Sequence, residues 1–149
     1  MAILKLKKRL FEDKVQLKGV ITLTIRDKNG KIRLKKTIKN TITDNGKTRI
    51  AQLICGLSTT SFKYIGIGSG TASASGLGSP IAYIQASVGA NVSGAWWDIT
   101  YTASSSVTVT EAVLCDSSSG GTVLSYQNFS GISLIAGEQL SIHWAILLS

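Results

Sequence analysis

Val20-Ile-Thr-Leu-Thr-Ile-Arg26 has Ile or Leu at every second position, with Val20, Thr22, Thr24 and Arg26 on the alternate positions. This period of two is typical of a β-strand with one buried face and one exposed face. The next residues are Asp27-Lys-Asn-Gly30, and Asn-Gly is a strong turn pair because both residues tolerate the positive φ angles of tight hairpins. A second alternating run follows the turn. Residues 18–40 are therefore predicted to form a β-hairpin.

The second strand of this hairpin predicts a cationic ribbon on its exposed face. Its inner face carries Ile32, Leu34 and Ile38. Its outer face carries Lys31, Arg33, Lys35 and Lys39. These four cations are candidate contacts with phosphate groups or with an acidic partner. Contacts of cationic side chains with phosphates depend on charge and do not depend on the base sequence. The alternatives are a solvated hairpin face and an edge whose lysines deter unwanted strand pairing.

The rest of the chain predicts one short helix followed by strands. A helix over about 45–56 is predicted, with an inner stripe formed by Ile50, Leu53, Ile54 and Leu57. A strand then runs from Phe62 into a glycine-rich bend, and the small residues over 71–80 predict a loop. Further strands are predicted over residues 81–87, 96–103, 107–115, 122–129 and 139–148. Short strands at regular spacing are typical of an antiparallel sandwich or barrel.

We therefore predict an all-β fold, mainly an antiparallel, jelly-roll-like β-sandwich, with one short α-helix and an N-terminal basic hairpin. In this prediction residues 18–149 form a single domain and residues 1–17 form a basic N-terminal arm. A chain of 149 residues with 44% apolar content is able to bury one core. Its longest apolar stretches are far shorter than the roughly 20 residues needed to cross a bilayer, so a membrane partner is not expected.

Charge is distributed unevenly along the chain. All 16 Lys and Arg residues lie between Lys5 and Lys63, and the formal net charge of the whole chain is +8. The later segment is rich in Ser, Thr and Gly. A basic segment joined to a nearly uncharged β segment indicates that the two ends face different environments. This pattern favours a component of an assembly over a free-standing enzyme, with neighbouring copies packed against the Ser and Thr faces of the strands.

The residue types needed for hydrolytic catalysis do not occur in a suitable pattern. His143 is the only histidine, it lies on the outer face of the last predicted strand, and no Gly-x-Ser-x-Gly elbow occurs. Asp98 and Glu111 are carboxylates that strand pairing could bring together, but nothing in the sequence sets the distance between them. No enzymatic activity and no catalytic residue are predicted.

Neither a cofactor site nor a metal site is predicted. Gly66-Ile-Gly-Ser-Gly-Thr71 resembles a phosphate-binding loop, but it lacks the Gly-Lys-Ser/Thr triplet and no long helix follows it. A tight β-turn is therefore predicted for this motif. Cys55 and Cys115 have no metal-ligand spacing, and we expect both to be buried free thiols.

Trp96 and Trp97 are adjacent on a predicted strand, so their side chains must point to opposite faces. They therefore cannot form a single stacking platform for bases or sugars. We predict one indole in the core and the other at a subunit contact. Together with His143, which points outward, Trp96 and Trp97 are the candidate subunit interface.

Four stretches of the chain, in this order, resemble a broad group of viral virion proteins. The stretches are Lys39-Asn-Thr-Ile-Thr-Asp-Asn-Gly-Lys-Thr-Arg-Ile-Ala-Gln-Leu-Ile54, Tyr64-Ile-Gly-Ile-Gly-Ser-Gly-Thr71, Thr110-Glu-Ala-Val-Leu-Cys-Asp116 and Leu140-Ser-Ile-His-Trp-Ala-Ile-Leu-Leu-Ser149. The group comprises tail, tail-fibre and minor structural proteins of phages and archaeal viruses. Its pattern is a helix, a glycine-containing strand, a strand with Thr-Glu, and a closing strand with a late Trp.

The resemblance implies a non-enzymatic structural protein located in the virion, an oligomeric building block of a viral tail, spike, collar or capsid surface. Its implied partners are further copies of itself and other virion proteins, with the basic N-terminal segment directed at nucleic acid, the capsid or an acidic partner. One alternative is a nucleic-acid-binding module that uses the cationic hairpin. A second is a host-surface or glycan-binding adhesin that uses the loop over 71–80 and one Trp.

Overall fold

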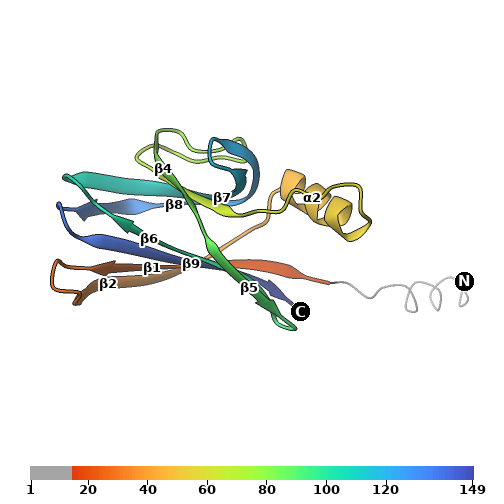
Figure 1. The fold of residues 1–149 in the computed structure, drawn as a ribbon, viewed down its shortest axis with the longest axis horizontal. Helices are drawn as coiled ribbons and strands as arrows, with labels where there is room; N and C mark the ends of the chain where they lie inside the picture. The colour runs from red at the N-terminus through yellow and green to blue at the C-terminus, as the bar shows by residue number, and fades with distance from the viewer. Residues whose placement is uncertain (1–14) are drawn as a thin grey trace, which may run out of the picture.

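The computed structural model describes residues 15–149, so the arm predicted over residues 1–17 lies outside the described residues except at 15–17. The described chain folds into two packed antiparallel sheets, as predicted (Figure 1). The elements are β1 (Leu17–Arg26), β2 (Ile32–Asn40), α2 (Asp44–Ile54), β3 (Tyr64–Gly68), β4 (Pro80–Gln85), β5 (Ser87–Asn91), β6 (Gly94–Thr102), β7 (Val107–Ser117), β8 (Gly120–Leu134) and β9 (Gln139–Leu148).

Consecutive β-hairpins of the chain belong alternately to the two sheets. The five-stranded sheet has the order β2-β1-β9-β6-β5, and the four-stranded sheet has the order β4-β3-β7-β8. The hairpins β1–β2 and β5–β6 belong to the first sheet, whereas β3–β4 and β7–β8 belong to the second. The last strand, β9, then inserts between β1 and β6 and closes the first sheet.

The core lies between the two sheets and confirms the predicted inner face of β1. Ile21, Leu23 and Ile25 are fully buried. Trp144 of β9 is also fully buried and pairs in register with Ile21, and Ile67 of β3 reaches the same core from the other sheet. Because every second residue of a strand points to the same face, the alternation in the sequence is sufficient to orient β1 and β9.

The turn of the predicted hairpin is held by a side chain. The Asp27 carboxylate accepts hydrogen bonds from the backbone N–H groups of Asn29 at 2.9 Å and Lys31 at 3.0 Å. Within this turn Gly30 has a positive φ, of 80°, and Asn29 does not. The Asn-Gly pair lies in the turn as predicted, and Asp27 supplies the local hydrogen bonds that close it.

The strand predicted over residues 81–87 is in fact two strands in different sheets. β4 forms an edge of the four-stranded sheet, β5 forms an edge of the five-stranded sheet, and Ala86 alone joins them. The N–H of Ala86 donates to the carbonyl of Lys63 at 2.7 Å, which holds the chain where it crosses. The composition Ser-Val-Gly-Ala-Asn of β5 has no strong alternation, so the sequence did not indicate it.

The helix α2 is fixed to the sandwich by its first turns. The Thr43 hydroxyl caps it by accepting from the N–H of Gly46 at 2.9 Å. A Cβ at Gly46 would lie 2.8 Å from the carbonyl oxygen of Leu124 in β8, so only glycine allows this close approach. Ile54 and Leu57 lie beyond the docked turns and are 83% and 80% exposed, so the predicted inner stripe is wrong at both residues.

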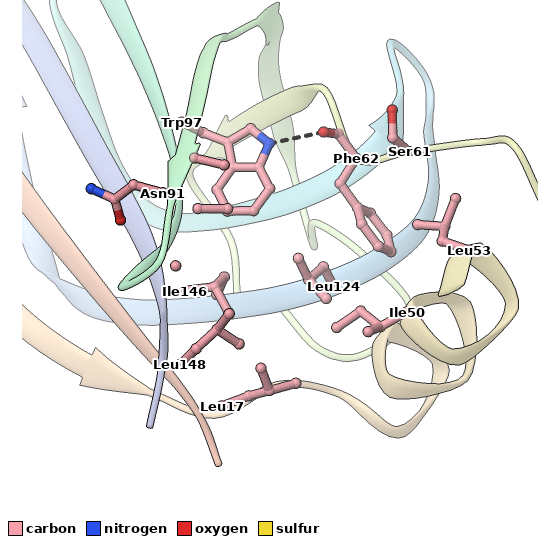
Figure 2. A pocket seen from close by; sticks show the side chains of 13 residues that line it. Leu17, Ile50, Leu53, Ser61, Phe62, Asn91, Trp97, Leu124, Ile146 and Leu148 are labelled. Carbon is pink, nitrogen blue, oxygen red and sulfur yellow. Dashed lines mark hydrogen bonds between the residues drawn. The ribbon is translucent and has the colours of Figure 1, made fainter. Parts of the chain in front are cut away.

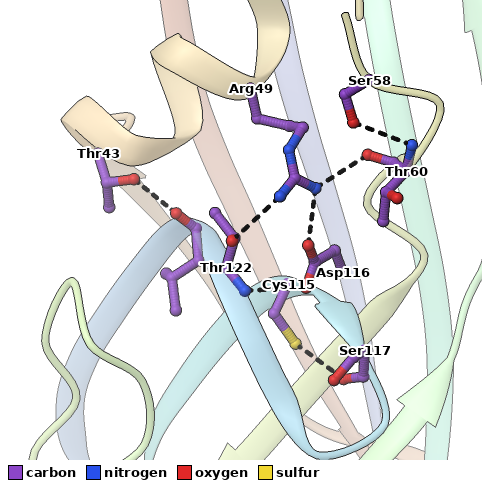
Figure 3. A network of polar contacts seen from close by, with 9 residues as sticks. Thr43, Arg49, Ser58, Thr60, Cys115, Asp116, Ser117 and Thr122 are labelled. Atoms are coloured by element: carbon purple, nitrogen blue, oxygen red, sulfur yellow. Dashed lines mark hydrogen bonds and ion pairs between the residues drawn. The ribbon is translucent and has the colours of Figure 1, made fainter. Parts of the chain in front are cut away.

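Arg49 ties the middle of α2 to the neighbouring segments (Figure 3). Its guanidinium donates to the Asp116 carboxylate at 2.7 Å, to the Thr60 carbonyl at 3.0 Å and to the Thr122 hydroxyl at 3.3 Å. The Arg49 side chain is mostly buried and that of Asp116 is almost completely buried. One arginine therefore joins the helix, the 58–63 segment and the β7–β8 turn.

Candidate interaction surface

The five-stranded sheet has an outer face, directed away from the second sheet, on which no helix or strand of residues 15–149 packs. Strand register arranges its outward side chains in transverse rows. One row comprises Thr37, Thr22, His143, Asp98 and Ser87. The neighbouring row comprises Lys39, Val20, Ala145, Trp96 and Gly89. Strands far apart in the sequence thus build one continuous surface, which we call the outer face.

Charge decreases across the outer face from the β2 edge to the β5 edge. Lys35 and Lys39 are exposed at the β2 edge. Hydroxyl pairs follow toward the centre, with oxygen–oxygen distances of 3.3 Å between Thr22 and Thr37 and 3.1 Å between Thr100 and Ser141. β5 has no charged residue. The outer face therefore has a cationic side and a neutral side.

His143 and Asp98 form a polar pair near the middle of the outer face. The distance between His143 Nδ1 and Asp98 Oδ1 is 2.7 Å, and each side chain is about half exposed. Asp98 does not meet Glu111, because Glu111 belongs to β7 in the other sheet. Thr22 is the cross-strand neighbour of His143, and its hydroxyl contacts Thr37. This dyad was not predicted, because only strand order brings β6 next to β9.

The two adjacent tryptophans occupy different environments, as predicted from their positions on a strand. Trp97 is 8% exposed, and its Nε1–H donates to the Phe62 carbonyl at 2.8 Å, so it is a core residue. Trp96 lies on the outer face, and a Cβ on Gly89 would lie 2.4 Å from its ring. Of the three predicted interface residues, Trp96 and His143 share the outer face, whereas Trp97 does not reach it.

Arg33 departs from the predicted cationic ribbon. The register of β1 and β2 shifts between Ile25 and Arg26, and this bulge leaves Arg33 without a cross-strand partner. Its guanidinium instead binds both carboxylate oxygens of Glu138 at 3.0 Å and donates to the Ser133 carbonyl at 2.8 Å. Arg33 therefore connects β2 to the β8–β9 turn and is already neutralised by this carboxylate.

The same bulge changes the orientation of the residue that precedes Arg33. Ile32 pairs with Arg26 and is 53% exposed, so its predicted place on the inner face is wrong.

Glu138 is buried, and the N–H of Ile135 and the Arg33 guanidinium lower the pKa of its carboxyl group. Sequence reasoning missed this ion pair because its two members are more than one hundred positions apart.

Lys35 and Lys39 remain exposed along β2, Lys31 is exposed just before this strand, and Lys36 of β2 is exposed as well. These four lysines are the cations that the β2 edge presents, and we call them the lysine edge. Their contact with phosphate groups or with a partner remains a prediction. β2 is the outermost strand of its sheet, and all four side chains of the lysine edge are exposed to solvent.

The glycine-rich loop binds a carboxylate of the chain itself. The backbone N–H groups of Gly70, Gly78 and Ser79 all donate to the carboxylate of Glu111, at 3.0 Å for Ser79. Glu111 is fully buried, and a Cβ on Gly70 would lie 2.8 Å from its carboxylate. The N–H groups that a phosphate-binding loop would direct at a ligand are therefore occupied by Glu111.

An apolar pocket of about 310 Å³ opens where α2 meets the ends of β1, β6 and β9 (Figure 2). Its walls include Leu17, Ile50, Phe62, Trp97 and Ile146. Its polar side chains are those of Ser61 and Asn91, so the pocket suits an apolar group.

The two cysteines differ, and the prediction of two buried thiols is wrong for one of them. Cys55 is exposed at the C-terminal end of α2. Cys115 of β7 is buried, and burial raises the pKa of its thiol to about 11, because a thiolate is disfavoured away from water. Cys115 is therefore a neutral core side chain at physiological pH.

Comparison with protein-family models, with curated proteins and with solved structures gave no significant match. Over residues 15–149, no group of three or more His, Cys, Asp or Glu side chains is placed to hold a metal ion. The described helix is too short to span a bilayer. The candidate site is therefore the outer face together with its two edges.

Proposed function

We propose that this protein is a non-enzymatic structural protein of a virion, which assembles as a homo-oligomer into a viral tail, spike, collar or capsid surface. The observation that carries the proposal is the outer face, which combines an uncovered sheet surface with Trp96 and with rows of Ser and Thr side chains. Interfaces between subunits are depleted of charge in their centres and enriched in aromatic side chains. The sequence resemblance supports the location in a virion.

The charge distribution supports the same proposal. Two copies of a chain with a net charge of +8 repel each other, so contact through an uncharged surface is favoured over contact through a charged one. The β5 side of the outer face supplies neutral surface, and the lysine edge lies at the opposite end of the same sheet. Copies are therefore able to associate while their cations stay directed toward nucleic acid, the capsid or an acidic partner.

The test is the molecular mass of nucleic-acid-free protein, measured by size-exclusion chromatography with light scattering at about 0.15 M and at 1 M salt. This change shortens the Debye length from about 8 Å to about 3 Å, so weak contacts between charges fail while apolar contacts persist. We expect a discrete oligomer under both conditions. A monomer at every concentration and salt would overturn the proposal.

A second candidate function is nucleic-acid binding through the lysine edge, and the exposure of Lys31, Lys35 and Lys39 favours it. Replacing these three lysines by glutamine should reduce the affinity for duplex DNA and lower the slope of log K against log salt by about 0.9 per lost phosphate contact. The control replaces Lys47 and Lys63, which are exposed outside the hairpin, and the two variants are compared by the loss of affinity per substituted lysine. Equal loss per lysine would mean that the hairpin is not the binding site.

A further inference from the structure

The two edges of the five-stranded sheet are protected very differently. The β2 edge carries the lysine edge and a β-bulge, which are two devices that prevent pairing with another strand. The β5 edge, Ser87–Asn91, has no charge and no proline, and its pairing with β6 has no bulge. Residues 64–97, which surround β5, contain no Asp, Glu, Lys, Arg or His. β5 is therefore the unprotected edge of this sheet.

The free side of β5 has backbone groups available for a further strand. β5 pairs with β6 on one side and is the last strand of its sheet. Alternate residues of an edge strand direct their N–H and C=O groups outward. Within residues 15–149, no backbone hydrogen bond from outside the sheet reaches positions 87–91. The outward groups of β5 are thus left to solvent.

An apolar hollow lies beside this free edge. It has a volume of about 340 Å³, and its walls include Phe62, Val88, Ala90 and Trp97. Val88 is 59% exposed and pairs in register with Trp97, so it faces the same side of the sheet as the core residues. A strand added beside β5 would place every second side chain over this hollow. Backbone pairing and apolar burial would therefore occur together.

We propose that β5 pairs antiparallel with β5 of a second copy of this chain, so that two five-stranded sheets become one continuous sheet. The inference rests on the proposed homo-oligomeric function and names the surface through which the copies associate. Antiparallel pairing of one segment with itself is compatible with two-fold symmetry, because the same surface serves both copies. It also places the two lysine edges at the far ends of the joined sheet, where repulsion between the copies of a +8 chain is smallest.

The test replaces Val88 by lysine and uses Ile32→Lys as the matched control. Both residues are more than half exposed, and each lies on an edge strand of the same sheet, so each variant replaces an exposed aliphatic side chain by one added positive charge. We expect Val88→Lys to raise the dissociation constant of the β5 contact by about 100-fold or more, because each copy would bring a lysine with no acidic partner into an apolar strand pairing. Ile32→Lys should keep the wild-type mass.

Hydrogen exchange provides a second readout of the same contact. In the concentrated wild-type protein the amides of residues 87–91 that point away from β6 should be protected, and this protection should be lost on dilution and in Val88→Lys. If Val88→Lys fails to fold by circular dichroism, Ser87→Lys on the same strand replaces it, because Ser87 is exposed on the outer face.

The outcomes separate this inference from the proposed function. A wild-type oligomer whose mass and exchange are unchanged by Val88→Lys would overturn the β5 contact and leave the building-block proposal in place. A wild-type protein that is monomeric at every concentration would overturn both. Equal dissociation of Val88→Lys and Ile32→Lys would show a general charge effect and would also overturn the β5 contact.

Discussion

Replacement of Glu111 by alanine is expected to remove the internal anchor of the glycine-rich loop. The fully buried carboxylate accepts three backbone hydrogen bonds, from Gly70, Gly78 and Ser79. A hydrogen bond to a charged group contributes about 1.5–3 kcal/mol, so the three together set a ceiling of roughly 4.5–9 kcal/mol. Part of this is recovered because the loop over 69–79 can open and bind water. We therefore expect the free energy of unfolding to fall by about 3–5 kcal/mol.

The assay is denaturant unfolding followed by tryptophan fluorescence, with Thr110→Val as the matched control. Thr110 donates one hydrogen bond to the Gly70 carbonyl at 2.7 Å, so its loss should cost only about 1 kcal/mol. Limited proteolysis should cut the loop of the Glu111→Ala protein faster than that of the control. A loss below about 1 kcal/mol for Glu111→Ala would refute the reasoning, because the loop would then not depend on the carboxylate.

Three further predictions concern single side chains. The pKa of the Glu138 carboxyl group is lower in the folded protein than its ordinary value of 4.5. The ionised carboxylate therefore stabilises the fold above pH 4.5, and this stabilisation is lost as the pH falls through the folded pKa. In acid titrations of thermal stability, Glu138→Gln should remove this pH dependence. A disulfide reagent should label Cys55 in the native protein and Cys115 only on unfolding, and rapid labelling of both would contradict the buried position. Trp144→Ala should lower stability by about 3–5 kcal/mol, because the side chain is fully buried, whereas an unchanged melting temperature would exclude its assigned core position.

Several features of the candidate site were accessible from the sequence. The outward position of Lys35 and Lys39 follows from the alternation of β2, and the outward position of His143 follows from that of β9. The opposite orientations of Trp96 and Trp97 follow from strand geometry alone. These predictions depend only on which face of its own strand a residue occupies.

Other features required the assembled fold. The bulge at Arg33 interrupts the alternation of inward and outward side chains along β2, and no residue type in β2 predicts this bulge. The binding of Glu111 to the glycine-rich loop joins two motifs that the sequence shows only as separate stretches. The Asp98–His143 pair depends on the insertion of β9 between β1 and β6.

The sequence by itself determined the all-β class, the hairpin over residues 18–40 and the inner faces of β1 and β9, because a period of two is a local property of a strand. It also determined that all Lys and Arg residues lie between Lys5 and Lys63, since their positions can be read without the fold. Only the tertiary structure decided that β5 forms an unprotected edge, that Arg33 is neutralised by Glu138, and that the outer face is uncovered. These features depend on which distant segments become neighbours, and that choice is made by the packing of the two sheets around their common core.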